Sequence, residues 1–503
     1  MPNRVLNKLV KTYFILNANL QSISFENQEE ILFWLVNKCQ DTVFGKRYWF
    51  KNIQTIRDFQ NQVPIAHYHD IEPRIHYMLK WERDITYPGK IDRFATSSWT
   101  TWNESKYIPV TKEWLKRCHF KWWAEVLRFF CKNNPRSQFL KWKWLVVWWT
   151  FSQNPYTWEE NIGFISAILQ KNTPRVGKLL KVPWDDIAYI DNREEKLNAI
   201  VKQTVKENIT FINGQPGWVL NLLYKILEYT GKKNILEVRP NLELFFRGWL
   251  PIKLYKSQFE ELIPSPKMKY YQIYNASEWF FGVQDQNWAD DMLLLTNHWT
   301  FYEFIPAEEY GKKNPKVLTL EEVNIGEEYV MLITTYSGLR RYVIWDVVTF
   351  TNLDPWKIKI IWRTKYFIDV IWERLLLKHI EKAILETTNK TDTIVSEFTV
   401  WPLINQENSG SRGSHEWVIE FIKPPKDLKN FTQILDTELW NLNSYYFDER
   451  HDTKTLWFPI IHAVEQWTFY DRMKSKNKLW WQFKVPKVKN DREVLDDILN
   501  FIK

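Results

Sequence analysis

Apolar residues recur at helical spacing in several parts of the chain. They lie three and four positions apart within residues 1–40, which predicts helices there, the second over Glu29–Cys39. A longer helix is predicted over residues 112–132. Two further helices are predicted over Arg193–Asn208 and Trp218–Tyr229, the latter followed by Gly231 as a C-cap.

Short apolar runs between these helices predict β-strands. The runs are rich in branched and aromatic residues, which favour strands. They lie at Leu145–Val147, Leu242–Phe246, Met292–Leu295, Tyr329–Thr334 and Lys357–Ile361. Because strands and helices alternate and no repeat is visible, we expect an α/β fold of mixed sheets and helices.

The last third of the chain carries a pattern of its own. Ile371–Leu385 has the spacing of a helix, and a strand, the loop Gln406–Gly413, a second strand and a helix are expected after it. This order predicts a separate, smaller α/β domain. We therefore expect a large N-terminal domain over residues 1–365 and a small C-terminal domain over residues 366–503.

Composition narrows the class of protein. With 45% hydrophobic and 25% charged residues, the chain is typical of a soluble globular protein. Residues 1–20 lack the apolar core and cleavage site of a signal peptide, and no apolar run is long enough to predict a membrane span. Because the three cysteines also lack metal-ligand spacing, a reducing cytoplasm is expected. The net charge of +8 is spread thinly, which favours a solvated surface over a nucleic-acid patch.

Tryptophan and glycine occur in unusual numbers. The chain has 30 Trp and 14 Gly among 503 residues, whereas glycine is normally about 7% of a protein. Some bacterial lineages read the codon UGA as glycine and others read it as tryptophan, so translation with the wrong table would give this pattern. We hypothesise that many of these positions are glycine in the native protein; a truly Trp-rich chain is the alternative. The abundance of Lys, Asn and Ile suggests an AT-rich genome, and hence a bacterium.

A run of hydroxyl side chains surrounds one of these tryptophans. Short hydroxyls and backbone N–H groups can bind phosphate, and glycine is used in such loops because a side chain blocks the anion's approach. The run predicts a cradle for the phosphates of ATP, although a plain Ser/Thr-rich turn is the alternative. Its members are Ser97, Ser98, Thr100 and Thr101 around Trp99, with Lys106 after them.

Two more segments carry candidate chemistry. In Tyr274–Glu278 an aromatic ring can stack on adenine and a carboxylate can hold Mg²⁺, although a tyrosine at a strand end is usually part of the core. In Arg340–Asp346, followed by Trp362–Lys365, a carboxylate at a strand end can accept both ribose hydroxyls; a surface ion pair is the alternative.

Taken together and in this order, the segments resemble the auxin-responsive Gretchen Hagen family of acyl-acid amido synthetases. That family belongs to the adenylate-forming superfamily, with acyl-CoA synthetases and luciferases. The resemblance covers nearly the whole chain. The segments that carry it are Ser97–Thr101, Ser105–Val110, Asn241–Trp249, Phe259–Lys267, Tyr274–Glu278, Thr300–Phe304, Tyr342–Asp346, Arg363–Lys365, His415–Trp417 and Lys484–Pro486.

The resemblance implies a two-step ligase reaction. A small carboxylic acid attacks the α-phosphate of ATP to give an acyl-adenylate and pyrophosphate, and the amine of an amino acid then displaces AMP to form an amide. Mg²⁺ would offset the phosphate charge. The family architecture is a large adenylate-forming domain with a smaller mobile C-terminal domain, which here would turn at Arg363–Tyr366.

The resemblance also implies a role for each site residue. Glu278 would ligate Mg²⁺, and Lys484 would stabilise the adenylation transition state from the small domain, with Lys365 as a less favoured candidate. Asp346 would bind the ribose, helped by Arg363. The phosphates would be held by Ser97, Ser98, Thr100, Thr101 and Lys106, and adenine by Tyr274, Asn275, Ala276 and Ser277.

The departures from the family pattern fall mostly on glycine. Tryptophan would insert a bulky ring at turns that need a positive φ or a close approach of the backbone. The family glycines correspond to Trp99, Trp249, Trp299, Trp345 and Trp362, and by weaker matches to Trp148, Trp149, Trp279, Trp372, Trp480 and Trp481. We expect the indoles of Trp99 and Trp345 to crowd the nucleotide site.

Two alternatives remain open at this point. An acyl-CoA synthetase-like enzyme shares the first half-reaction but passes the acyl group to coenzyme A. A non-catalytic binding protein follows if the tryptophans are genuine and block the ATP loop. The sequence selects neither the acyl acid nor the amino acid, and it carries no signal for an oligomeric state.

Overall fold

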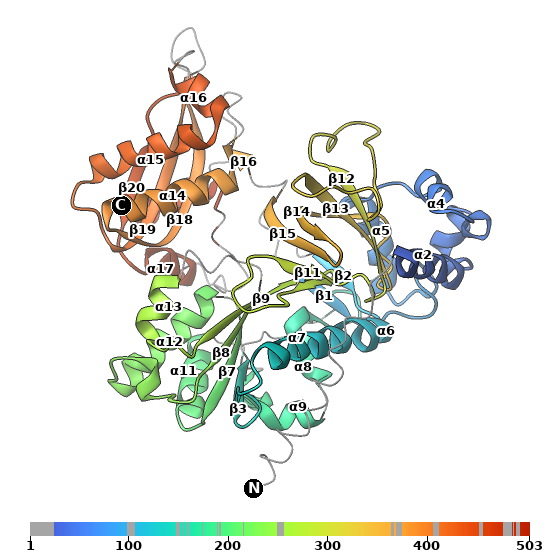
Figure 1. Cartoon of the computed structure of the whole chain (residues 1–503), viewed down its shortest axis with the longest axis horizontal. Helices are drawn as coiled ribbons and strands as arrows, with labels where there is room; N and C mark the ends of the chain where they lie inside the picture. Colours follow the sequence, from blue (N-terminus) through green and yellow to red (C-terminus); the bar gives the residue numbers. More distant parts are fainter. Residues whose placement is uncertain are drawn as a thin grey trace. The chain divides into compact units, whose positions relative to one another are not determined.

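Strands and helices form two compact units in the computed structural model (Figure 1). The first unit spans Met1–Ser97, Glu104–Ile344 and Val348–Lys359, and the second the remaining residues. The structure describes residues 25–97, 106–146, 151–248 except 153, 158, 160, 174, 189, 191, 192 and 215, then 256–363, 367, 368, 375–405, 412–451, 456–475, 485, 487, 488 and 493–502.

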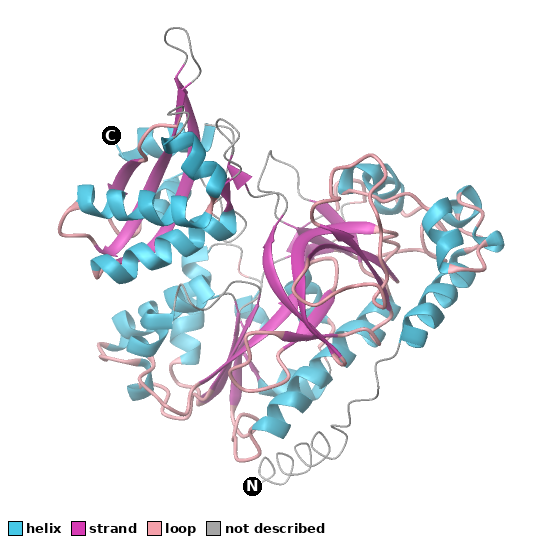
Figure 2. Ribbon diagram, turned by 45° about the horizontal axis from the view of Figure 1, so that its top comes forward, coloured by secondary structure: helices cyan, strands magenta, loops and turns pink. Residues whose placement is uncertain are grey.

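The first unit is built around a large mixed sheet, which has eleven strands among the described residues. Its order is β12 (Thr300–Pro306), β13 (Glu328–Thr335), β14 (Tyr342–Leu353), β15 (Trp356–Arg363), β11 (Met292–Leu294), β10 (Phe280–Val283), β9 (Lys269–Asn275), β8 (Leu244–Gly248), β7 (Ile209–Gly214), β3 (Lys143–Val146) and β6 (Lys181–Val182). The strands at the β12–β15 end curve strongly (Figure 2). All five predicted strands are confirmed, with ends shifted by one or two residues where both ends are described.

The strands β6, β3, β7, β8 and β9 run parallel, so the chain must cross over between them. Helix α12 (Pro216–Thr230) connects β7 to β8, and α13 (Lys256–Leu262) connects β8 to β9. Their apolar faces bury Leu223 and Phe259 against Phe245 of the sheet. The predicted C-cap is confirmed: Gly231 has a φ of +66°, and its N–H donates to the carbonyl of Leu227 at 2.8 Å.

A second sheet carries the start of the hydroxyl run. Its order is β2 (Lys106–Pro109), β1 (Phe94–Ser97), β5 (Ile162–Phe164) and β4 (Phe151–Ser152). β1 and β2 are antiparallel, and the register pairs Ser97 with Lys106. The run predicted to hold phosphate therefore begins and ends at the same end of the β1–β2 pair.

The remaining helices of the first unit agree in part with the sequence. Helix α2 (Phe25–Cys39) confirms the prediction over Glu29–Cys39, and the predicted helix over 112–132 is α6 (Lys112–Trp114), a π-helical turn at Leu115–His119 and α7 (Phe120–Asn133). The predicted end at Asn208 is wrong: α11 (Arg193–Thr204) stops earlier, because a turn after Thr204 leads into β7. The others are α3 (Val43–Arg47), α4 (Ile56–Gln62), α5 (Tyr68–Leu79), α8 (Ile165–Lys171), α9 (Arg175–Leu180) and α10 (Asp185–Ala188), with 3₁₀ turns at Phe50–Asn52 and Ile235–Glu237.

The second unit is a sheet between two layers of helices. The strands β18 (Ile394–Asn405) and β19 (Arg412–Lys423) are antiparallel, and β20 (Ile460–Val464) runs parallel to β19. Helices α14 (Leu377–Thr391) and α15 (Leu428–Leu442) lie side by side on one face (Figure 1), where Ile380 and Leu435 pack on Trp417. On the other face lie α17 (Thr468–Ser475) and α18 (Glu493–Ile502); α16 (Ser444–His451) and a pair formed by β16 (Phe367–Ile368) and β17 (Leu375–Leu376) complete the unit.

Two boundaries predicted in this unit are wrong. The helix predicted from Ile371 begins at Leu377, because Leu375 and Leu376 pair with β16 and a short apolar run fits a strand as well as a helix. The loop predicted to reach Gly413 ends earlier, because Arg412 and Gly413 continue the β18–β19 ladder. Residues 364–366 lie outside the described residues, so the hinge and the domain boundary at 365 stay predictions. None of the described helices has the length and apolarity needed to cross a bilayer.

Candidate active site

Tyr68 on α5 supports the start of β2. The N–H of Tyr107 donates a hydrogen bond to the Tyr68 hydroxyl at 2.9 Å. The ammonium group of Lys106 lies 5.1 Å from the centroid of the Tyr68 ring, and the lysine is only 8% exposed. A cation over an aromatic face is stabilised by the ring's quadrupole, so Tyr68 fixes both the strand and the lysine.

The segment predicted to bind adenine is a turn between two antiparallel strands. β9 ends at Asn275, and the N–H of Ala276 donates to the carbonyl of Trp279 at 2.8 Å, which closes the turn before β10. Tyr274 is fully buried, and its ring centroid lies 4.7 Å from that of Phe281. The turn over Asn275–Glu278 therefore rests on an aromatic pair.

The phosphate and adenine segments meet in space. The hydroxyl of Ser277 donates to the backbone carbonyl of Thr96 at 3.3 Å, although the two residues are far apart in sequence. A Cβ atom at Gly248 would lie 3.2 Å from the side-chain oxygen of Asn275, so the end of β8 also comes close to this turn. The end of β1, the end of β8 and the turn Asn275–Glu278 thus lie next to one another in the first unit.

The third predicted segment, Arg340–Asp346, approaches the turn Asn275–Glu278 through Tyr342. Burial and the negative charge of nearby Glu278 raise the pKa of the Tyr342 hydroxyl, which keeps it protonated. Tyr342 opens β14, and Asp346 lies four residues further along this strand, on the same face. The carboxyl-bearing Asp346 is fully buried.

Arg341 forms a buried ion pair rather than the surface pair that the sequence left open. Its Nε lies 3.1 Å from both carboxylate oxygens of Glu303, and its Nη1 donates to the carbonyls of Gln60 and Val63, each at 2.7 Å. The surface alternative is therefore wrong for this residue. The pair joins the Thr300–Phe304 segment to the strand that carries Asp346, a structural link that the sequence did not show.

Several predicted site residues lie outside the described residues. They are Ser98, Thr100, Thr101, Lys365 and Lys484, together with Trp99 and Trp249; for Ser97, Trp345 and Arg363 the strand backbone is described but not the side chain. Their roles, and the crowding expected from Trp99 and Trp345, stay predictions. Within the described ranges, no group of three His, Cys, Asp or Glu residues is placed to hold a metal ion.

Of the segment that follows Lys484, residues 485, 487 and 488 are described, and they are held on both faces of the second unit's sheet. Val485 packs with Trp401 and Leu495 on one face, and Val488 belongs to the core on the other face. The carbonyl of Lys487 accepts a hydrogen bond from the N–H of Val400 at 3.0 Å. These contacts attach Val485, Lys487 and Val488 to both layers of the unit.

Lys487 is also held through its side chain. Its ammonium group pairs with the carboxylate of Glu397 and lies 4.2 Å from the centroid of the Phe398 ring. Burial lowers the pKa of Lys487 to about 8, opposed by the charge of Glu381, whose own pKa is raised to about 7 by burial. A lysine and two glutamates thus meet beside β18, where Val488 pairs with Val400.

Models of one family match most of the chain. The GH3 family N-terminal domain matches residues 21–268, the GH3 family central domain residues 293–363 and the GH3 family C-terminal domain residues 378–493. The chain belongs to the GH3 family. The family predicted from the sequence is therefore confirmed. The matched ranges include two of the three chemistry-bearing segments, Ser97–Lys106 and Arg340–Asp346, while Tyr274–Glu278 lies between the matched ranges.

Curated relatives of this GH3 protein are plant enzymes. It is 21% identical to the indole-3-acetic acid-amido synthetase GH3.3 of Arabidopsis thaliana, over 95% of this chain and 92% of the relative. It is 20% identical to GH3.4 of the same plant, an indole-3-acetic acid-amido synthetase too, over 92% of this chain and 88% of the relative. The predicted enzyme class, a ligase of the acyl acid amido synthetase type, agrees with these relatives.

Solved structures show the same fold. The acyl acid amido synthetase AtGH3.15, in complex with 2,4-DB, has a TM-score of 0.81 at 16% identity, covering 99% of this chain and 96% of that one. A 2-hydroxyisobutyryl-CoA ligase, in the postadenylation state with 2-HIB-AMP, has a TM-score of 0.61 at 14% identity, covering 96% and 95%. The predicted α/β adenylate-forming fold is confirmed.

Proposed function

We propose that this GH3 protein is an ATP-dependent ligase that adenylates a carboxylic acid and transfers the acyl group to the amine of an amino acid. One observation carries the proposal beyond family membership. The Ser277 hydroxyl bonds to the backbone of β1, and Glu278 lies beside Tyr342, so segments that could bind phosphate, base and ribose converge. Such convergence of polar groups at strand ends is typical of nucleotide sites in α/β folds.

The chemistry needs positive charge and positioning. In the first step a carboxylate oxygen attacks the α-phosphorus, a P–O bond forms, and the bond to pyrophosphate breaks. Because both reactants are anionic, Lys106 at the loop and Lys484 from the small domain would offset their charge. In the second step the amine nitrogen attacks the acyl carbon, AMP leaves, and the nitrogen loses a proton.

The other site residues would bind the nucleotide. Asp346 would accept the ribose hydroxyls with help from Arg363, and Asn275, Ala276 and Ser277 would surround the adenine. Tyr274 is predicted to lie on the base, but its ring is fully buried against Phe281, so in this structure it is part of the core beneath the turn. The remaining phosphate ligands would be Ser97, Ser98, Thr100 and Thr101.

Glu278 fits the role of a magnesium ligand. It is a half-buried carboxylate in the turn that meets β1, and Mg²⁺ prefers carboxylate oxygens together with substrate phosphates. The ion would supply charge neutralisation at the phosphates. The same turn would then hold the base and the metal.

The first half-reaction is tested by exchange of labelled pyrophosphate into ATP with a panel of carboxylic acids. At least one acid should support exchange, and Lys106→Ala should lower kcat/KM about a hundredfold or more because a charge at the phosphates is lost. Lys116→Ala, which removes an exposed lysine, is the matched control and should exchange normally. Exchange that is equal in both variants would contradict the role of Lys106.

The second half-reaction separates this proposal from its rivals. With amino acids as acceptors, an amide should form without coenzyme A; a thioester formed only with coenzyme A would favour an acyl-CoA synthetase. Absence of exchange with every acid, in protein made with glycine at the suspect Trp positions, would favour a binding protein.

Backbone geometry supports the hypothesis that some tryptophans stand for glycine. Among the described non-glycine residues, eight have a positive φ, and five of these are tryptophan. A left-handed conformation places the Cβ atom too close to the backbone, so bulky residues rarely adopt it. The five are Trp49, Trp81, Trp288, Trp299 and Trp467.

Trp299 is the one family glycine position at which a positive φ is described. Trp279, Trp345 and Trp362 are not in the left-handed region, so a close approach of other groups, rather than φ, would be the reason for glycine there. Peptide mass spectrometry of protein from its natural source should find glycine at these positions. We place the protein in the cytoplasm of a bacterium that reads UGA as glycine.

A further inference from the structure

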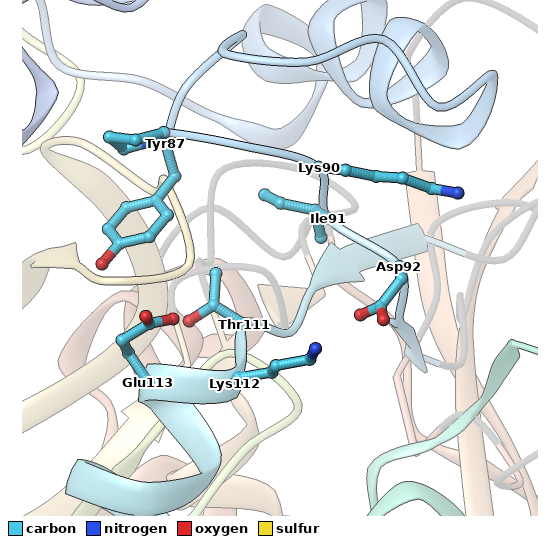
Figure 3. A pocket seen from close by; sticks show the side chains of 8 residues that line it. Tyr87, Lys90, Ile91, Asp92, Thr111, Lys112 and Glu113 are labelled. Carbon is cyan, nitrogen blue, oxygen red and sulfur yellow. The ribbon is translucent and has the colours of Figure 1, made fainter.

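A cavity of about 350 Å³ lies beside the β1–β2 pair, between the segment Tyr87–Asp92 and the first turn of α6 (Figure 3). Its volume is at the lower end of the range for small-molecule sites. No tryptophan lines it, although Trp81, one of the tryptophans with a positive φ, lies against the lining residue Lys90.

The cavity contains a buried hydroxyl that lacks a partner. Tyr87 is only 4% exposed, and its hydroxyl has no hydrogen bond to any residue that the structure describes. In Figure 3 this hydroxyl points toward the carboxylate of Glu113, across the cavity from Lys112. Burial and the charge of Glu113 raise the pKa of Tyr87, so the hydroxyl keeps its proton and can both donate and accept. Buried polar groups in native proteins nearly always have a partner, so an unpaired one in a cavity points to a ligand.

Two opposite charges in the cavity are available to a ligand. Glu113 and Lys112 are neighbours in α6, and neither forms an ion pair within the described ranges. Of the other two charges, Asp92 pairs with Arg93 at 2.7 Å, and the ammonium group of Lys90 lies over the ring of Trp81, a contact that glycine at position 81 would remove. One free carboxylate beside a hydroxyl, and one free ammonium group, complement a small zwitterion.

The cavity is separated from Ser97 and Lys106, the described ends of the phosphate segment, by the length of a strand. Asp92 precedes Phe94 at the start of β1 and Thr111 follows the end of β2, whereas the phosphate segment begins at Ser97 and ends at Lys106. A strand advances about 3.3 Å per residue, so the two ends of β1 are about 10 Å apart. Reacting atoms must approach to about 3–3.5 Å. An amine held in the cavity would therefore be too far away to attack an acyl group held at Ser97 and Lys106.

We propose that this cavity is a second binding site, separate from the acceptor site, for a free α-amino acid. The ammonium group of the ligand binds Glu113 and the Tyr87 hydroxyl, and its carboxylate binds Lys112. The ligand joins the chain before β1 to the chain after β2, and so restrains the strand pair that carries Ser97 and Lys106. The claim that this cavity is separate from the acceptor site rests on the proposed function. The claim that the cavity binds an amino acid does not.

Isothermal titration calorimetry of the full chain, without ATP or acid, tests binding with the twenty amino acids. At least one should bind, and its N-acetyl and carboxamide forms should bind about tenfold to a hundredfold more weakly, because each loses a charged contact. Glu113→Gln and Tyr87→Phe should weaken binding, while Glu82→Gln, an exposed glutamate outside the cavity, should not. Failure of every amino acid to bind, or equal binding by Glu113→Gln and Glu82→Gln, would overturn the proposal.

Amide synthesis separates a second site from the acceptor site. In Glu113→Gln, the KM for the acceptor amino acid should stay within about twofold of the wild-type value, because the acceptor binds elsewhere. A rise in that KM equal to the rise in the calorimetric Kd would show that the cavity is the acceptor site. If no amide forms with any acid, the proposed function fails, and the calorimetric result still decides whether the cavity binds an amino acid.

Discussion

The buried pair of Arg341 and Glu303 links β12 to the start of β14, the two neighbours of β13 in the first unit's sheet. Glu303 lies on β12, and Arg341 immediately precedes β14, which carries Asp346. The guanidinium group also satisfies the carbonyls of Gln60 and Val63, so one side chain ties the C-terminal end of α4 to the sheet. A fork of fixed donors is required, because an ammonium group cannot serve a carboxylate and two carbonyls in these directions.

Removal of one partner should therefore destabilise the protein strongly. We expect Arg341→Met to lower the free energy of unfolding by about 3–5 kcal/mol, because Glu303 is left buried and unpaired. The double variant with Glu303→Gln should recover part of this loss. Urea unfolding of the two single variants and the double variant measures the coupling, and strictly additive losses would contradict a direct interaction.

At this scale the sequence predicted residue types but not their surroundings. Hydroxyls, a lysine, a tyrosine and a carboxylate could be assigned from local motifs, because phosphate, base and ribose each need a particular group. The support of Lys106 by Tyr68, and the approach of Glu278 to Tyr342, arise from contacts between segments far apart in the chain. No local pattern in the sequence encodes such contacts.

Among elements, the segment after Lys484 joins three parts of the second unit. Lys487 contacts Glu397 and Phe398 of β18 and is influenced by Glu381 of α14, while Val485 and Val488 enter opposite cores. The sequence motif Lys484–Pro486 could be recognised, but the three residues that fix its position could not. The start of α14 was mispredicted for a related reason, because strand pairing outweighed local spacing.

The raised pKa of Glu381 predicts a pH dependence of stability. Between pH 4.5 and about 7 the unfolded chain releases the Glu381 proton while the folded chain keeps it, so wild-type stability should fall relative to Glu381→Gln as pH rises. The difference should reach at most about 3 kcal/mol and level off above pH 7. Urea unfolding at a series of pH values measures it.

Lys487→Met provides the second variant for this experiment. Because the charge of Lys487 lowers the pKa of Glu381, its removal should raise that pKa and extend the decline in stability to higher pH. Parallel pH profiles for the wild type, Glu381→Gln and Lys487→Met would contradict the coupling between α14 and this segment.

For the whole molecule, one question is whether the tryptophans suit the fold. The chain matches the GH3 family and has its α/β architecture despite the 30 tryptophans. The reason is that the apolar pattern and most motif residues lie at other positions. The sequence could predict the anomaly from composition. It could not locate the strained positions, because a positive φ depends on how each turn connects its neighbours.

Two exposed tryptophans form a matched test of this strain. Trp49 has a φ of +44° and is 68% exposed, whereas Trp184 is 54% exposed and is not in the left-handed region. Trp49→Gly should raise the free energy of unfolding by about 1 kcal/mol, because the steric cost of a left-handed Cβ disappears. Trp184→Gly should give no gain, because glycine there adds only freedom to the unfolded chain. Thermal and urea unfolding of both variants decide the matter: if Trp49→Gly is as unstable as Trp184→Gly or more so, tryptophan is tolerated at this turn, and the fold gives no support to glycine there.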